Sequence, residues 1–144
     1  MIGMTILQPV VALMIWTMIV WAWMYAVRIP AMQASKDIDT RNLHGGTGKD
    51  LDGVLPDRVQ WKAHNYNHLH EQPVVFYALA IYSHLVGVAD PLNIGLAWAY
   101  VILRVAHSIF QATVNFVPVR FVLFSLSSIV LIVMAVRNLL ALMV

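Results

Sequence analysis

The stretch from Asp57 to Gly87 reads DRVQWKAHNYNHLHEQPVVFYALAIYSHLVG, and its character changes halfway along. Its first half is rich in charged, amide and histidine side chains, whereas the half after Pro73 is mostly apolar and aromatic. We interpret it as one long helix over 57–87 that enters a lipid bilayer with its polar half. Proline inside a helix removes a backbone hydrogen bond, so we expect a kink just after Glu71.

One side of this predicted helix gathers groups that can hold a proton, an anion or a metal. At helical spacing, His64, His68 and Glu71 project from the same side. Ionisable side chains are costly in hydrocarbon, so their presence within a membrane-spanning helix indicates a functional site.

The composition places the rest of the chain in the membrane as well. Of 144 residues, 60% are hydrophobic and only 11% are charged, with a mean hydropathy of +0.74. Because one crossing needs about 20 residues, the length suits one domain, 1–144, with four membrane-spanning helices. The expected helices cover about 5–28, 57–87, 92–116 and 119–142. The predicted fold class is therefore all-α, an integral membrane four-helix bundle with the lipid bilayer as its surroundings.

The charged residues indicate an orientation rather than a nucleic-acid partner. The net charge is +2, but the basic residues form no patch interleaved with exposed aromatic side chains, so we expect no nucleic acid to bind. Six of the nine basic residues lie on one side of the membrane, namely Arg28, Lys36, Arg41, Lys49, Arg58 and Lys62. By the positive-inside rule, the polar loop 29–56 faces the cytoplasm and both termini lie outside the inner (cell) membrane.

The expected third helix, 92–116, carries a polar stripe on an otherwise apolar surface. Arg104, His107, Gln111 and Asn115 recur at three- and four-residue intervals, so the stripe must face protein or trapped water. At 1.5 Å per residue, Arg104 lies roughly 18 Å from either end of its helix and Glu71 roughly 15 Å inside the hydrocarbon. We expect these two opposite charges to pair near mid-membrane.

The two polar stretches resemble the membrane-associated proteins in eicosanoid and glutathione metabolism, the MAPEG family. The first stretch is NYNHLHEQPVVFY, from Asn65 to Tyr77, and the second is RVAHSIFQATVNFVPVRFVLF, from Arg104 to Phe124. Together with the hydropathy pattern, the resemblance covers about residues 5–142 and is of a bacterial type.

The resemblance implies a homotrimer of four-helix subunits that binds glutathione between neighbours on the cytoplasmic side. It implies that Arg120 is the catalytic residue that stabilises the glutathione thiolate. The residues that it implies for glutathione binding are His64, His68, Glu71, Arg104, His107 and Gln111. The implied activity is that of a transferase or peroxidase acting on lipophilic electrophiles that arrive from the bilayer.

This sequence departs from the family pattern at several of these positions. His68 stands where the family usually has asparagine, and His64 where it usually has arginine. Gln111 and Phe124 replace two expected tyrosines. These departures leave open an alternative, a non-catalytic membrane subunit or binding protein that kept the fold and packs against a larger complex.

A third interpretation is a metal or haem site. His64, His68 and Glu71 have the H-x-x-x-H spacing with a nearby carboxylate, and His107 could reach across from the next helix. Cysteine is absent, so disulfides and thiolate ligands are excluded and any thiol must come with a ligand. We expect no metal, since the spacing alone provides no fourth ligand.

Overall fold

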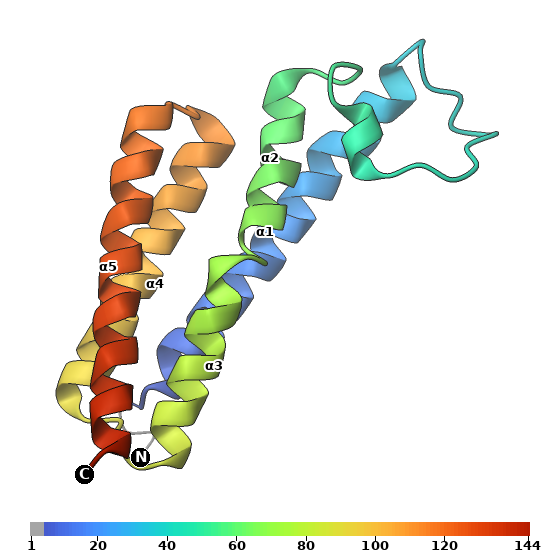
Figure 1. Cartoon of the computed structure of the whole chain (residues 1–144). Helices are drawn as coiled ribbons and strands as arrows, with labels where there is room; N and C mark the ends of the chain where they lie inside the picture. Colours follow the sequence, from blue (N-terminus) through green and yellow to red (C-terminus); the bar gives the residue numbers. More distant parts are fainter. Residues whose placement is uncertain (1–4) are drawn as a thin grey trace.

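The computed structural model describes residues 5–144, and these residues form five α-helices and one short 3-10 helix. The helices are α1 (Leu7–Ala34), α2 (Asp57–His68), α3 (Gln72–Leu85), α4 (Pro91–Thr113) and α5 (Val117–Leu142), and the 3-10 helix η1 (Gly48–Leu51) lies between α1 and α2. Because α3 continues from the end of α2, the five helices form four columns of one elongated bundle (Figure 1). The predicted all-α bundle is confirmed.

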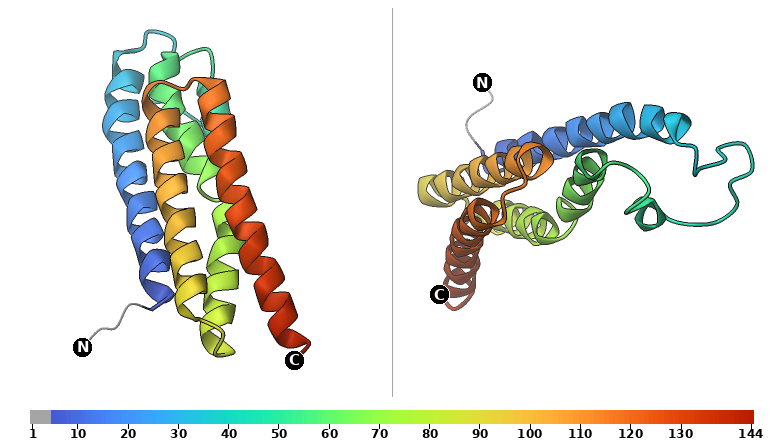
Figure 2. Two further views of the ribbon diagram at one scale, coloured as in Figure 1. Left: turned by 90° about the vertical axis from the view of Figure 1, so that its left-hand side faces the viewer. Right: turned by 90° about the horizontal axis from the view of Figure 1, so that it is seen from above.

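The two ends of the bundle differ in what they carry. The start of α1, the α3–α4 connection and the end of α5 lie together at one end, which we call the terminal end (Figure 1). The long loop after α1 and the short α4–α5 turn lie at the opposite end, which we call the loop end (Figure 2). The start of α5, with Arg120, therefore lies at the same end as the long polar loop.

The predicted single helix over 57–87 is wrong in one respect, because the chain breaks at 69–71. Pro73 has no N–H to donate to the carbonyl of Leu69, and its ring would clash with that carbonyl in a continuous helix. The helix therefore ends at His68 and a new one begins at Gln72. As a result His68 and Glu71 lie on either side of a break in the middle of the bundle.

Other helix ends also differ from those expected. Helix α1 extends to Ala34 rather than to 28 and contains Pro30, so the loop expected at 29–56 begins only after Ala34. With 28 residues, it is about 42 Å long, more than the hydrocarbon core of about 30 Å. Arg28 thus lies inside α1 and does not mark the end of the helix.

Helix α4 ends at Thr113 rather than at 116, because the chain turns there through a left-handed residue. Asn115 has a φ of 55°, and its N–H donates to the carbonyl of Phe110 at 2.8 Å. Pro118 then occupies the first turn of α5, which begins at Val117 rather than at 119. The turn places Asn115 beside the start of α5.

The bundle is apolar outside and partly polar inside. Met18 on α1 and Phe121 on α5 are 56% and 68% exposed, whereas Arg104 is fully buried. Within residues 5–144, three helices are long and apolar enough to cross a membrane, namely α1, α4 and α5. Apolar side chains on the outside of the bundle suit contact with lipid. Polar side chains in its interior can hold neighbouring helices together by hydrogen bonds.

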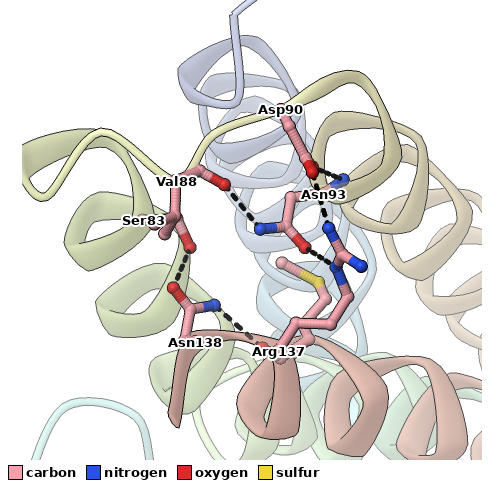
Figure 3. A network of polar contacts seen from close by, with 7 residues as sticks. Ser83, Val88, Asp90, Asn93, Arg137 and Asn138 are labelled. Atoms are coloured by element: carbon pink, nitrogen blue, oxygen red, sulfur yellow. Dashed lines mark hydrogen bonds and ion pairs between the residues drawn. The ribbon is translucent and has the colours of Figure 1, made fainter. Parts of the chain in front are cut away.

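A polar cluster ties three elements together at the terminal end (Figure 3). Asp90 caps α4 by accepting the backbone N–H of Asn93 at 2.8 Å, and it also accepts from Arg137 at 2.6 Å. Arg137 donates in addition to Asn93 Oδ1 at 2.8 Å, while Ser83 on α3 donates to Asn138 at 2.8 Å. The cluster fixes the α3–α4 connection to the end of α5.

Candidate functional site

The polar stripe of α4 faces the polar side of α2, and the two helices run in opposite directions. Asn65 of α2 donates to Ser108 of α4 at 2.8 Å, and Trp16 of α1 donates to the same hydroxyl at 2.9 Å. Further along, His68 Nε2 lies 3.4 Å from Arg104 Nη1. Arg104, His107 and Gln111 are buried, as expected of a stripe that must face protein or trapped water, whereas Asn115 lies beyond the end of α4.

Arg104 is the most demanding group in this interface. Its side chain is fully buried, and its Nε and Nη2 groups have no hydrogen-bond partner among residues 5–144. The guanidinium carbon lies 5.6 Å from the centre of the Phe124 ring, a cation–π distance. A buried cation with two unused N–H groups is costly for a fold and is suited to an anionic ligand.

The predicted pair between Glu71 and Arg104 is wrong, because a histidine stands between them. Glu71 Oε2 lies 2.8 Å from His68 Nδ1, and the Glu71 side chain is 67% exposed. The helix break explains this placement, since Glu71 follows the end of α2 and bends back over its last turn. Arg104 therefore meets the carboxylate only through the imidazole ring of His68.

A cavity of about 230 Å³ opens beside this histidine, between the end of α2 and the start of α5. Its lining consists of His68, His107, Val117, Arg120, Phe121 and Phe124. Arg120 donates to Asn115 Oδ1 at 2.6 Å, which fixes the guanidinium at the first turn of α5, and its Nε has no partner within the described chain. The cavity thus combines one cation, two imidazoles and an aromatic wall.

His107 and Gln111 also lie in the interior, with side chains that lack full hydrogen bonding. His107 is 2% exposed and its ring centre lies 5.0 Å from that of His68. The Nδ1 of His107 and the Oε1 of Gln111 have no partner among the residues that the structure describes. His107 lines the cavity, whereas Gln111 and Arg104 are not among its lining residues.

His64 does not join this group, although it lies one helical turn from His68. Its Nε2 lies 2.9 Å from Asp52 Oδ1, in a contact with the loop between α1 and α2. The Gln60 amide also donates to Asp52 at 2.6 Å, and the hydrogen bonds from Gln60 and then His64 hold the pKa of Asp52 below its ordinary value. Gln60 in turn accepts from Arg28 at 3.1 Å, so the loop is fastened to both helices.

This placement does not support the metal interpretation. His64 and Glu71 contact different partners, and no group of three or more histidine or acidic side chains within residues 5–144 is arranged to hold a metal ion. His107 does reach across to His68, as expected, but no further histidine or acidic side chain among the described residues completes a ligand set with them.

A second cavity lies on the α1 side of α2, under the long loop. It measures about 430 Å³, and its lining includes Arg28, Lys49, Asp52 and His64. Gly48 of this loop approaches Arg28 so closely that an added Cβ would come within 3.2 Å of the guanidinium. His64 therefore belongs to this loop cavity rather than to the cavity at Arg120.

Several polar residues of the interior were missed by the sequence reasoning. Gln72 donates to Ser128 at 2.8 Å and accepts from Tyr100 at 3.1 Å, which links α3, α4 and α5 just beyond the helix break. Asn65 and Ser108 lie one turn from His68 and Arg104, so helical spacing could have indicated them. Gln72 offered no such signal, because its direction depends on the break at 69–71.

Comparison with known proteins agrees with the arrangement of the helices and the polar interior. The model of the MAPEG family matches residues 6–140, nearly the whole chain. The searches of curated proteins and of solved structures gave no match. Because the family model matches nearly the whole chain, this chain belongs to the MAPEG family.

Proposed function

We propose that this protein is a membrane-bound, glutathione-dependent transferase or peroxidase that acts on lipophilic electrophiles. The observation that carries the proposal is the cavity in which Arg120 and two histidines meet the aromatic rings of Phe121 and Phe124. A cation on one wall suits a thiolate, and an apolar wall suits a substrate that arrives from lipid. Family membership supports the same choice.

The residues fit a thiol peptide with negative charges. Arg104 and Arg120 both keep N–H groups without partners in the described chain, as expected of a site that completes its hydrogen bonds with a ligand. We propose that His68, Glu71, Arg104, His107 and Gln111 contribute to holding the peptide, with His64 reaching it from the loop cavity.

Arg120 is placed to favour the reactive form of the sulfur. A free thiol has a pKa of about 8.5 and is mostly protonated at neutral pH, whereas a neighbouring guanidinium stabilises the thiolate. Arg120 also lies in the first turn of α5, where the helix dipole acts in the same direction. Glutathione supplies the nucleophile, whose sulfur forms a C–S bond with an electrophile while a leaving group departs or a carbon–carbon π bond opens. Alternatively, two molecules of glutathione reduce a peroxide to an alcohol and water and leave as the disulfide.

We further propose that the active form is a homotrimer in the inner membrane, with the long loop in the cytoplasm. The cavity volume of about 230 Å³ is below the range of about 300–1,000 Å³ usual for ligand sites, so a neighbouring subunit would complete the wall. With Arg120 at the start of α5, seven of the nine basic residues belong to segments at the loop end, which supports the orientation by the positive-inside rule.

The proposal is tested by calorimetric titration of the detergent-purified protein with glutathione. We expect saturable binding, and we expect S-methylglutathione, which lacks the ionisable thiol, to bind more weakly. No heat of binding at millimolar glutathione would contradict the proposal and would favour the non-catalytic alternative.

A further inference from the structure

His68 has a defined tautomer in this structure, set by its two neighbours. Its Nδ1 lies 2.8 Å from a carboxylate oxygen of Glu71, which can only accept, so Nδ1 carries the hydrogen. Its Nε2 lies 3.4 Å from Arg104 Nη1, which can only donate, so Nε2 carries a lone pair. His68 is therefore a neutral imidazole whose basic nitrogen, Nε2, makes only the long contact with Arg104, and whose other nitrogen donates to a carboxylate.

Of the two imidazoles that line the cavity, only His68 has a carboxylate partner within the part of the chain that the structure describes. His107 lies 5.0 Å from it between ring centres, but its Nδ1 has no partner among residues 5–144. A carboxylate on one nitrogen stabilises the positive charge that forms when the other nitrogen takes a proton. The protonated form of His68 is thus supported by Glu71, and that of His107 is not.

The remaining charges around His68 show when it can accept a proton. Arg104 and Arg120 face it and oppose an added positive charge, the uncharged ring of His107 packs beside it, and the carboxylate of Glu71 favours the added charge. The contact with Arg104 is long for a hydrogen bond, since N–H donors usually lie within about 3.2 Å of their acceptors. An anionic ligand in the cavity would offset the two arginines and leave Nε2 free to exchange this contact for a thiol.

We propose that His68 accepts the thiol proton of the glutathione that binds in this cavity. The S–H bond breaks, the electron pair stays on sulfur, and the proton forms an N–H bond at Nε2. Glu71 then stabilises the imidazolium, and Arg120 stabilises the thiolate, so each new charge has a partner. The inference rests on the proposed function. It gives a chemical role to His68, which stands where the family usually has asparagine.

The test is the number of protons that the protein releases when glutathione binds. Calorimetric titration in two buffers of different ionisation enthalpy gives this number, and ultraviolet absorbance of the complex shows the thiolate. If His68 keeps the proton, the wild-type protein should form the thiolate with a net release close to zero. Release of about one proton for each thiolate formed by the wild-type protein would overturn the proposal.

The variant His68→Asn keeps a polar side chain but cannot take a proton. We expect it either to lose the thiolate absorbance or to release about one proton to the buffer for each thiolate. A variant that forms the thiolate without net proton release would also overturn the proposal. His70→Asn is the matched control, because His70 is exposed, donates from Nδ1 to the Tyr66 carbonyl and does not line the cavity.

Failure of the proposed function can be told apart from failure of this inference. If the wild-type protein does not bind glutathione, the proposed function fails first. If it binds glutathione as the thiolate and releases the proton to the buffer, the function stands and the role of His68 is wrong.

Discussion

At the level of single residues, the buried charge of Arg104 lowers the stability of the fold but would favour the binding of an anionic ligand. Arg104 has one long contact to His68 and a ring face of Phe124, which is little compensation for a fully buried guanidinium. Helical spacing predicted correctly that Arg104 would not face lipid. It could not predict the partner, because the direction of Glu71 depends on the backbone at the helix break.

Arg104→Met is expected to leave the melting temperature in detergent unchanged or higher. Replacement of a buried, poorly paired charge by an apolar side chain of similar length is often neutral or stabilising, by about 1–4 kcal/mol. The same variant should lose affinity for glutathione, as measured by calorimetric titration. A marked fall in melting temperature would show that Arg104 has a structural role, and Arg58→Met, on the exposed surface of α2, is the control.

At the level of elements, the sequence predicted where polar and apolar helices lie better than where they end. The polarity change at Arg28 predicts the end of the first helix there, although the backbone of α1 continues as helix to Ala34. Pro73 was expected to kink a helix, but the missing N–H and the ring together divide it into α2 and α3. Hydropathy predicts which part of a chain can lie in a membrane, whereas helix ends depend on local backbone hydrogen bonds.

The cap of α4 should make stability depend on acid pH. The Asn93 backbone N–H, and next the charge of Arg137, hold the pKa of Asp90 below its ordinary value of 3.8. A depressed pKa in the folded state means that Asp90 contributes stability above pH 3.8, and that this contribution is lost as pH falls through the folded value. Asp90→Asn is therefore expected to lower the melting temperature at neutral pH and to reduce its fall below about pH 4.

Thermal unfolding followed by circular dichroism across this pH range checks the cap. Asp37→Asn is the control, because Asp37 is an exposed loop residue. Equal melting temperatures of Asp90→Asn and the wild-type protein at neutral pH would show that the cluster in Figure 3 does not hold the terminal end together.

For the molecule as a whole, the two ends of the bundle differ in how far their polar groups are paired. The terminal end is closed by the Asp90, Asn93 and Arg137 cluster, whose polar groups satisfy one another. The loop end contains the cavity of Arg120 and polar groups that lack partners in the described chain. The predicted membrane bundle and its family agree with the structure, whereas the residues that share one cavity became evident only from the fold, because His64 and His68 differ in partner despite adjacent turns.

The most direct test of the central claim is the ultraviolet thiolate absorbance of glutathione bound to the wild-type protein and to Arg120→Ala. We expect the wild-type complex to show the thiolate at neutral pH. The variant should keep its oligomeric size but show only the few per cent of thiolate expected for a free thiol with a pKa of about 8.5. Equal thiolate absorbance in both proteins would contradict the assignment of Arg120 as the catalytic residue.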